Sequence, residues 1–164
     1  MIFQYLDKKD FTALSQQLFD ILADNMSVIA PTGNSRQEDY RCWFSAVSDG
    51  LTRKERQIIL IKNGEEIIGF FQYYMTEDTL MMEEIQLKSE FHGKGKVFRN
   101  LYGFLFENIP GNLRYVKAYA NKQNEKSISI LQRLNLKIDT ENKNSKSWLF
   151  SGDFTGLLSW YKGE

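Results

Sequence analysis

The sequence contains little cysteine, histidine or proline. Its 164 residues include one cysteine, Cys42, and one histidine, His92. One chain therefore forms no internal disulfide and no zinc site built from several cysteine and histidine ligands. No apolar run approaches the roughly 20 residues that a membrane span needs. The first ten residues, MIFQYLDKKD, lack the basic start and long apolar stretch of a signal peptide. We expect a cytoplasmic protein that holds no metal and does not enter the membrane.

The chain also lacks an excess of either charge. It has 21 basic and 21 acidic residues, whereas a general nucleic-acid binder is usually strongly basic, so we expect no nucleic-acid partner. The charges are unevenly divided, because residues 1–82 hold 8 basic and 12 acidic residues while residues 83–164 hold 13 and 9. The basic half is compatible with a small polyanionic ligand, although an imbalance of this size also arises by chance.

Apolar residues are plentiful: 42% of the chain is hydrophobic and 14% is aromatic. A chain of this length can bury a full core without disulfides or metals. There is no internal repeat and no linker rich in Pro, Gly or Ser, so we expect one domain over 1–164.

The first third of the sequence predicts a strand and two helices. The strand covers Ile2 to Leu6. Apolar residues then recur at helical spacing from Phe11 to about Asn25, with Asp10 as the cap. Ser35 and Glu38 form a capping box that begins a second helix, and Gly50 is expected to end it.

The rest of the chain predicts an antiparallel meander followed by alternating helices and strands. Asn63-Gly64 indicates a hairpin turn. Helices are expected to begin near Val97 and at Asn124. The expected strands are 57–62, 67–75, 80–88, 115–120, 136–140 and 147–151. The expected order is β-αα-βββ-α-β-α-ββ.

A glycine-bearing basic loop lies between the strand that ends at Lys88 and the next helix. Its sequence over 92–97 is HGKGKV. A helix N-terminus leaves backbone N–H groups unpaired and carries a partial positive charge, and glycines let a ligand approach the backbone, so the segment is suited to bind phosphate. Four cations, Lys88, Lys94, Lys96 and Arg99, lie near it in sequence. The alternative is a glycine turn that begins a surface helix.

At this point the chain resembles the GCN5-related N-acetyltransferase (GNAT) superfamily. The family's loop reads Gln/Arg-x-x-Gly-x-Gly/Ala, and here His92, Gly95 and Val97 stand at its defined positions. Residues 87–95, LKSEFHGKG, are similar to the family's Val-x-Pro-x-x-Arg-Gly-x-Gly run. The segment from Asn124 through Leu131 to Leu136 is similar to the family's Asn-x-x-Ala, Tyr and Gly-Phe segment.

This resemblance implies a fold and a ligand. The fold is α/β, a mixed, mostly antiparallel twisted sheet of about seven strands with helices on both faces. The ligand is acetyl-CoA, bound as a cosubstrate. The family binds its pyrophosphate on the loop amides and pairs its pantetheine arm with the backbone of the fourth strand. The residues that correspond here are His92, Gly93, Lys94, Gly95, Lys96 and Val97 in the loop, Ile85, Gln86 and Leu87 in the strand, and Asn124 near the pantetheine.

Four positions depart from the family pattern. The mildest is Asn135, which replaces the family's Gly, because Asn tolerates the left-handed conformation that a helix stop needs. Val97 is bulkier than the usual Gly or Ala, and His92 replaces Gln or Arg. Leu131 stands where many members have the Tyr that protonates the leaving thiolate, so the general acid is unassigned. For the general base we consider two carboxylates, Glu84 and, second, Glu83. Alternation places Glu84 on a face with Gln86 and Lys88 and places Glu83 on the opposite, more core-like face, so we favour Glu84. Both are alternatively plain surface carboxylates.

The sequence thus predicts an N-acetyltransferase that moves an acetyl group from acetyl-CoA to a primary amine by direct attack in a ternary complex. The acceptor is a small molecule or a peptide, and the loops 25–34 and 142–146 are expected to select it. The chain is expected to be a monomer or a homodimer. Two alternatives stay open: a non-catalytic module that binds acyl-CoA, and a protein-interaction domain that keeps the fold without the cofactor.

Overall fold

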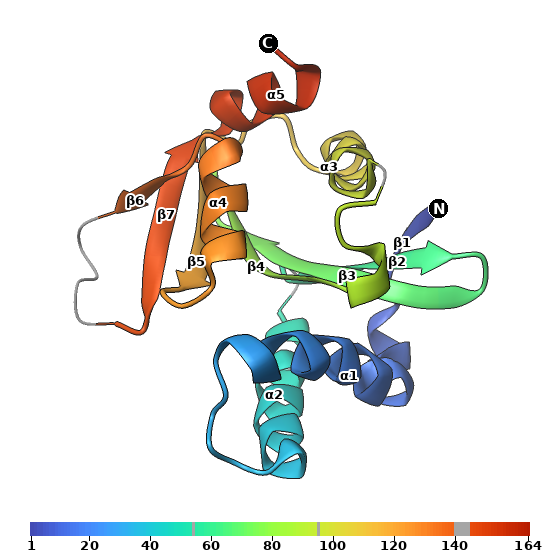
Figure 1. The fold of residues 1–164 in the computed structure, drawn as a ribbon. Coiled ribbons are helices and arrows are strands. Elements are labelled where there is room, and N and C mark those ends of the chain that lie inside the picture. Colours follow the sequence, from blue (N-terminus) through green and yellow to red (C-terminus); the bar gives the residue numbers. More distant parts are fainter. Residues whose placement is uncertain (54, 95, 140–144) are drawn as a thin grey trace. The chain divides into compact units, whose positions relative to one another are not determined.

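The computed structural model describes residues 1–53, 55–94, 96–139 and 145–164 (Figure 1). Seven strands form one sheet in the order β1-β2-β3-β4-β5-β7-β6. The neighbours β4 and β5 are parallel, and the pairs β1/β2, β2/β3, β5/β7 and β6/β7 are antiparallel. The predicted mixed, mostly antiparallel α/β fold is therefore confirmed.

In chain order the elements are β1 (Ile2–Tyr5), the 3-10 turn η1 (Lys8–Asp10), α1 (Phe11–Ile29), α2 (Arg36–Leu51), β2 (Gln57–Asn63), β3 (Glu66–Met75), β4 (Thr79–Leu87), the 3-10 turn η2 (Ser89–Phe91), α3 (Val97–Asn108), β5 (Tyr115–Asn121), α4 (Glu125–Arg133), β6 (Lys137–Asp139), β7 (Ser147–Asp153) and α5 (Phe154–Lys162).

The chain divides into two compact units. The first comprises Met1–Tyr73 and Glu84–Gly95, and the second comprises Tyr74–Glu83 and Lys96–Glu164. The strand β4 crosses this division, with its first residues in the second unit and its last residues in the first. No helix of the described residues is long and apolar enough to cross a membrane.

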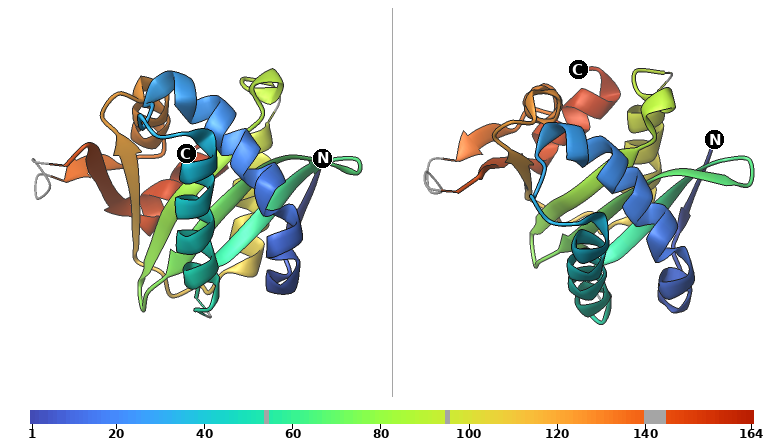
Figure 2. Two further views of the ribbon diagram at one scale, coloured as in Figure 1. Left: turned by 90° about the horizontal axis from the view of Figure 1, so that it is seen from below. Right: turned by 60° about the horizontal axis from the view of Figure 1, so that its bottom comes forward.

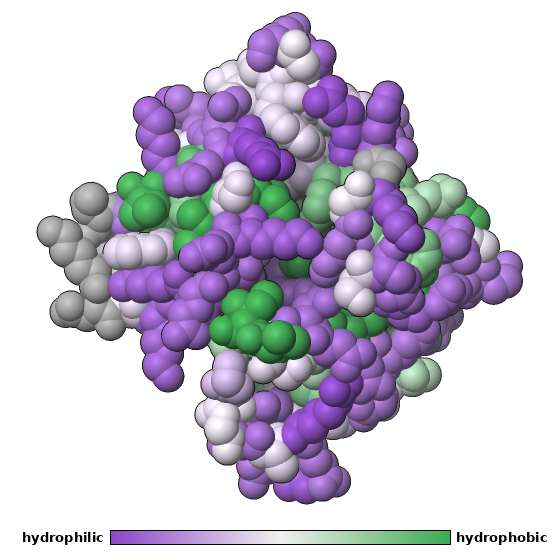
Figure 3. All heavy atoms as spheres, in the orientation of Figure 1, coloured by the Kyte–Doolittle hydropathy of each residue, from purple (hydrophilic) through white to green (hydrophobic). Residues whose placement is uncertain are grey.

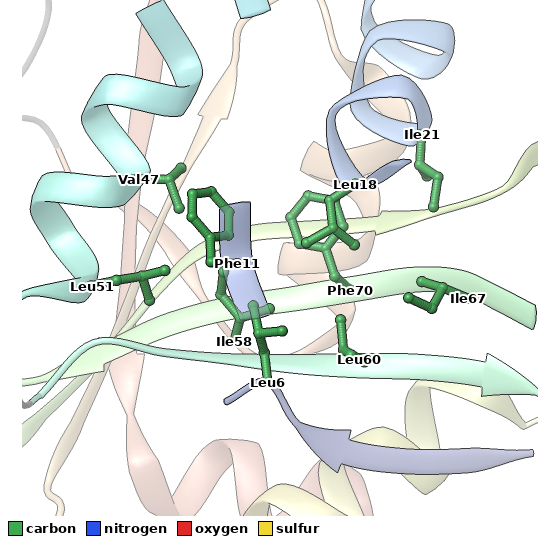
Figure 4. Packing of buried hydrophobic residues seen from close by; sticks show 10 residues of the cluster. All are labelled: Leu6, Phe11, Leu18, Ile21, Val47, Leu51, Ile58, Leu60, Ile67 and Phe70. Atoms are coloured by element: carbon green, nitrogen blue, oxygen red, sulfur yellow. The ribbon is translucent and has the colours of Figure 1, made fainter. Parts of the chain in front are cut away.

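In the first unit, α1 and α2 lie over one face of β2 and β3 (Figure 2). The core between them is made of aliphatic and aromatic side chains from both helices and from the strands (Figure 4). Burial of such side chains stabilises a fold by about 1.5–3 kcal/mol each. The ten residues of this cluster are Leu6, Phe11, Leu18, Ile21, Val47, Leu51, Ile58, Leu60, Ile67 and Phe70.

The ends of the two helices differ in part from prediction. The capping box of α2 is present, since Ser35 accepts from the Glu38 amide at 3.2 Å and Glu38 accepts from the Ser35 amide at 3.0 Å. The helix does not end at Gly50 but continues to Leu51, and Gly50 is not among the glycines with the positive φ of a terminating residue. Asp10 makes no side-chain cap.

The helix α1 also continues beyond Asn25 to Ile29. Its C-cap is Ala30, which precedes Pro31. A residue before proline is disfavoured in the helical region, so Pro31 marks the stop. The loop expected over 25–34 therefore begins after Ile29, and Asn25 is a helical residue.

The hairpin between β2 and β3 is confirmed, but its turn lies one residue later than expected. Asn63 pairs with Glu66, so the two-residue loop is Gly64-Glu65. Gly64 has φ of 62°, and Glu65 is not among the residues of positive φ. This pattern is typical of a type II′ turn, which needs glycine only at its first central position.

In the second unit, β7 pairs with both β5 and β6. Asn124 begins α4 as predicted, because its side chain accepts from the Ser127 amide at 3.1 Å. Asn135 follows α4 with φ of 65°, which asparagine tolerates better than most residues. Its side-chain amide donates to the Gly156 carbonyl at 2.8 Å and thereby ties the end of α4 to α5.

The C-terminal helix α5 was not predicted. It packs against α3 through an aromatic cluster in which Phe106 lies 5.2 Å from Tyr161 and 5.7 Å from Phe154, centroid to centroid. Tyr102 and Trp160 meet edge to face at 5.3 Å. Such pairs stabilise a fold by about 0.5–1.5 kcal/mol beyond their area. The C-terminal aromatic residues are therefore structural parts of the second unit.

Candidate functional site

The last residues of β4 lie against β3 in the first unit. The Lys88 amide donates to the Ile68 carbonyl at 2.8 Å. Gly69 lies so close that a Cβ there would overlap the Gln86 carbonyl oxygen and approach the Leu87 Cα to 3.2 Å. Backbone groups of successive strand residues point to opposite edges. Gln86 and Lys88 thus turn their backbone groups to β3, and the backbone groups of Ile85 and Leu87 point away from it.

The Leu87 carbonyl accepts two side-chain hydrogen bonds. Asn25 of α1 donates its Nδ2 at 2.9 Å, and the Nε2 of His92 donates at 2.7 Å. A carbonyl only accepts, so this contact requires the proton on Nε2. Sequence reasoning placed His92 among the ligand-binding residues. In the structure its Nε2 points toward the strand and joins the end of β4 to the loop.

A hydrogen-bond chain links α1 to one of the two candidate carboxylates. Asn25 Nδ2 also donates to Gln86 Oε1 at 2.9 Å, and Gln86 Nε2 donates to Glu84 Oε1 at 2.6 Å. Gln86 is only 8% exposed. Leu87, on the face of Glu83, is 6% exposed, and both carboxylates are half-buried, so burial alone does not separate the two faces.

A cavity of about 410 Å³ lies beside this chain, between the second half of α1 and η2. Two of its carboxylates, Asp20 and Asp24, each lie 3.0 Å from Arg36 of α2. Hydrogen bonds to Asp20 and then to Asp24 raise the pKa of Arg36 above its ordinary value. The lining residues are Gln17, Asp20, Ile21, Asp24, Asn25, Lys88, Ser89 and Glu90.

The loop before α3 has the features expected of an anion site. Gly93 has φ of 69° and open space around it. Lys96 is the N-cap of α3 and makes no side-chain cap, and the first turn carries no acidic residue. The first amides of α3 thus keep the partial positive charge of a helix N-terminus. Gly95 lies outside the described residues.

The four cations near the loop have different positions. Lys94 and Lys96 are exposed. Lys88 forms an ion pair with Glu66 of β3. Arg99 donates to the Tyr161 and Trp160 carbonyls at 2.9 and 3.4 Å, at the C-terminus of α5. Two of the four charges are thus engaged with the protein itself.

Two further positions from the family pattern lie in the second unit. The side-chain oxygen of Asn124 is engaged as the cap of α4, so its amide nitrogen is the atom that it can offer to a ligand. Leu131 is 9% exposed and belongs to the core. Of the expected acceptor loop over 142–146, residues 142–144 lie outside the described residues.

The molecular surface offers limited apolar area on the face shown in Figure 3. This face is mostly hydrophilic, and its hydrophobic patches are small and separated. Large contiguous apolar patches are what marks a protein-interaction surface. Among the described residues, no group of three or more His, Cys, Asp or Glu side chains is placed to hold a metal ion.

No family model matches the chain, and no curated protein matches it either. Solved structures do. An acetyltransferase from Streptococcus agalactiae aligns with a TM-score of 0.71 at 10% identity, over 93% of this chain and 98% of that one. PaiA N-acetyltransferase from Thermoplasma acidophilum, solved in complex with coenzyme A, aligns with a TM-score of 0.67 at 13% identity, over 94% of this chain and 100% of that one. An acetyltransferase from Desulfovibrio desulfuricans, ascribed to the GNAT family, aligns with a TM-score of 0.67 at 10% identity, over 93% and 98% of the two chains.

These similarities define the fold as that of acetyltransferases. The chain has the fold of the GCN5-related N-acetyltransferase superfamily, as its loop motif and its Asn124 segment implied. At identities of 10–13% the likeness concerns fold, because one fold hosts many activities.

Proposed function

We propose that this protein transfers an acetyl group from acetyl-CoA to a primary amine by direct attack within a ternary complex. The observation that carries the proposal is the succession of a strand end, a glycine turn with positive φ at Gly93, and a helix whose first turn has neither a side-chain cap nor an acidic residue. A glycine turn before a helix N-terminus is suited to bind the pyrophosphate of CoA.

The residues divide into three roles in this proposal. Amides of 93–97 bind the pyrophosphate, and Lys94 and Lys96 add charge. The backbone of Ile85 and the amide of Leu87 pair with the pantetheine arm, since both residues turn their backbone groups away from β3. The Leu87 carbonyl is excluded from that pairing because Asn25 and His92 already donate to it. Asn124 offers the amide nitrogen of its side chain as a hydrogen-bond donor near the pantetheine arm.

Glu84 is the proposed general base. An alkylammonium acceptor gives one proton to this carboxylate, directly or through water, and the neutral amine then attacks the thioester carbon. Main-chain amides of β4 stabilise the oxyanion that develops. The nitrogen releases its second proton to solvent water, the C–S bond breaks, and the CoA thiolate leaves and takes a proton from solvent. Water is assigned this last role because Leu131 has no hydroxyl.

Calorimetric titration with acetyl-CoA at two salt concentrations tests the phosphate site. We expect binding that weakens as salt rises, because backbone dipoles and lysines hold a polyanion. Gly93→Ala is expected to weaken binding at least tenfold by straining the turn. Gly64→Ala is the matched control, since Gly64 also has positive φ and open space around it. No binding at millimolar ligand, or equal effects of the two variants, would refute the proposal.

A second candidate function is a module that binds acyl-CoA without turnover. The buried Leu131 favours it, because the usual proton donor to the thiolate is missing. Release of free thiol from acetyl-CoA, measured over a panel of diamines, peptide N-termini and lysine peptides, separates the two. Binding with no thiol release from any amine supports the module, whereas amine-dependent release supports the enzyme.

A further inference from the structure

We infer that Asn25 and Gln86 are positioning residues that orient Glu84 and keep its carboxylate ionised. The inference rests on the proposed function, in which Glu84 is the general base. The unbroken chain of hydrogen bonds from α1 through Gln86 to Glu84 carries it. All three residues belong to the first unit.

The direction of the chain follows from its chemistry. Asn25 Nδ2 is a donor, so the Gln86 atom that it contacts at 2.9 Å is the acceptor Oε1. The other end of the same amide is then a donor, and it faces Glu84 Oε1 at 2.6 Å. Without Asn25, Gln86 Oε1 loses this donor, and the amide is held less firmly in position against Glu84. Asn25 thus acts on Glu84 through Gln86.

The effect on Glu84 has a definite sign. A donor directed at a carboxylate stabilises the ionised form more than the protonated form. Hydrogen bonds to charged groups contribute roughly 1.5–3 kcal/mol, and burial of Gln86 limits competition from water. Removing the donor should therefore make Glu84 harder to ionise.

Other charged groups lie on the elements around this hydrogen-bond chain, and they stay in place when Gln86 is changed. Asp24 of α1 is paired with Arg36 of α2. Lys88 of β4 is paired with Glu66 of β3. Asp20 of α1 is also paired with Arg36, Glu83 lies next to Glu84 in β4, and Glu90 lies in η2. A change in the titration of Glu84 in a Gln86 variant is therefore attributed to the loss of the Gln86 side-chain amide.

The test is an NMR titration of the Glu84 side-chain carboxyl in the full chain, which needs no turnover. In Gln86→Met, which keeps the length of the side chain, we expect the midpoint to rise by about one pH unit or more. Asn25→Ala should give a smaller rise, and the double variant no more than Gln86→Met alone, because Asn25 acts through Gln86. Ile67→Val, a core change in the same unit, controls for stability and should leave the midpoint unmoved.

Steady-state kinetics separate this inference from the proposed function. In an active enzyme, the acid limb of kcat/KM should move upward with the NMR midpoint in Gln86→Met, and Glu84→Gln should lose at least a hundredfold in kcat. An unmoved midpoint in Gln86→Met, or additive shifts in the double variant, overturns the inference whatever the activity. A moved midpoint with full activity in Glu84→Gln overturns the role of Glu84 as base, and with it the positioning role.

Discussion

The close approach of β3 and β4 at Gly69 gives a sharp test of the first unit. A Cβ at this position would overlap the Gln86 carbonyl oxygen, lie 3.0 Å from Leu87 Cδ1 and lie 3.2 Å from Leu87 Cα. Carbon atoms are best separated by about 3.5–4.0 Å. In Gly69→Ala the Leu87 backbone must therefore move away by roughly 0.3–0.8 Å. Since two of the three contacts are backbone atoms, no change of rotamer can relieve the overlap.

We expect Gly69→Ala to lower the free energy of unfolding by about 2 kcal/mol, the middle of the range for overpacked sites. In a domain of this size the midpoint of thermal unfolding should then fall by about 4–8 °C. Gly111→Ala is the control, because nothing lies within 4 Å of its Cβ position. It removes unfolded-state freedom and should raise stability slightly. Equal midpoints for the two variants would refute the packing argument.

Two further changes test the second unit and the helix ends. Burial raises the pKa of Tyr102, so above pH 10 the unfolded state loses this proton first and stability falls as pH rises. Between pH 9 and pH 11, the free energy of unfolding of Tyr102→Phe, measured in urea, should rise by about 1.4 kcal/mol relative to that of the natural protein. If the difference between the two free energies did not change with pH, the burial argument would be contradicted. Ser35→Ala removes the capping box of α2 and should cost about 1 kcal/mol. Ser27→Ala on the exposed side of α1 should cost none, and equal losses would show that the cap contributes nothing.

Elements with local signals could be predicted from the sequence. Ser35 with Glu38, and Asn124 before an amphipathic segment, specify helix starts through bonds that span three residues. Short continuous runs of apolar residues, separated by a glycine turn, specify β2 and β3. These predictions succeeded because the contacts that decide them lie within one turn or one strand.

The errors came from weighing the wrong local signal. The end of α1 was placed at Asn25, although Pro31 is the stronger stop. The helix α5 was missed, although Phe154, Leu157 and Tyr161 recur at spacings of three and four, and Gly163 follows with φ of 78°. The prediction treated the aromatic residues of this segment as packing residues and did not use their helical spacing. Both errors could have been avoided with the sequence alone.

The candidate site depended on contacts that no local signal contains. Asn25 and Gln86 are 61 residues apart, so no local pattern in the sequence relates them. Likewise, the role of His92 depends on the Leu87 carbonyl, which its side chain reaches only because the loop turns back over η2. The motif predicts the loop as a binding segment but does not tell which of its side chains face the protein.

The choice between Glu83 and Glu84 shows how local and long-range information combine. Alternation along β4 dictates that the two carboxylates lie on opposite faces, and the sequence contains this much. Which face meets α1 depends on register, because a slip of one residue would exchange them. The bond from the Lys88 amide to Ile68 and the close approach at Gly69 set that register. The hydrogen bonds that end at Glu84 therefore depend on Gly69. A substitution of Gly69 that moves Leu87 should also shift the titration of the Glu84 carboxylate.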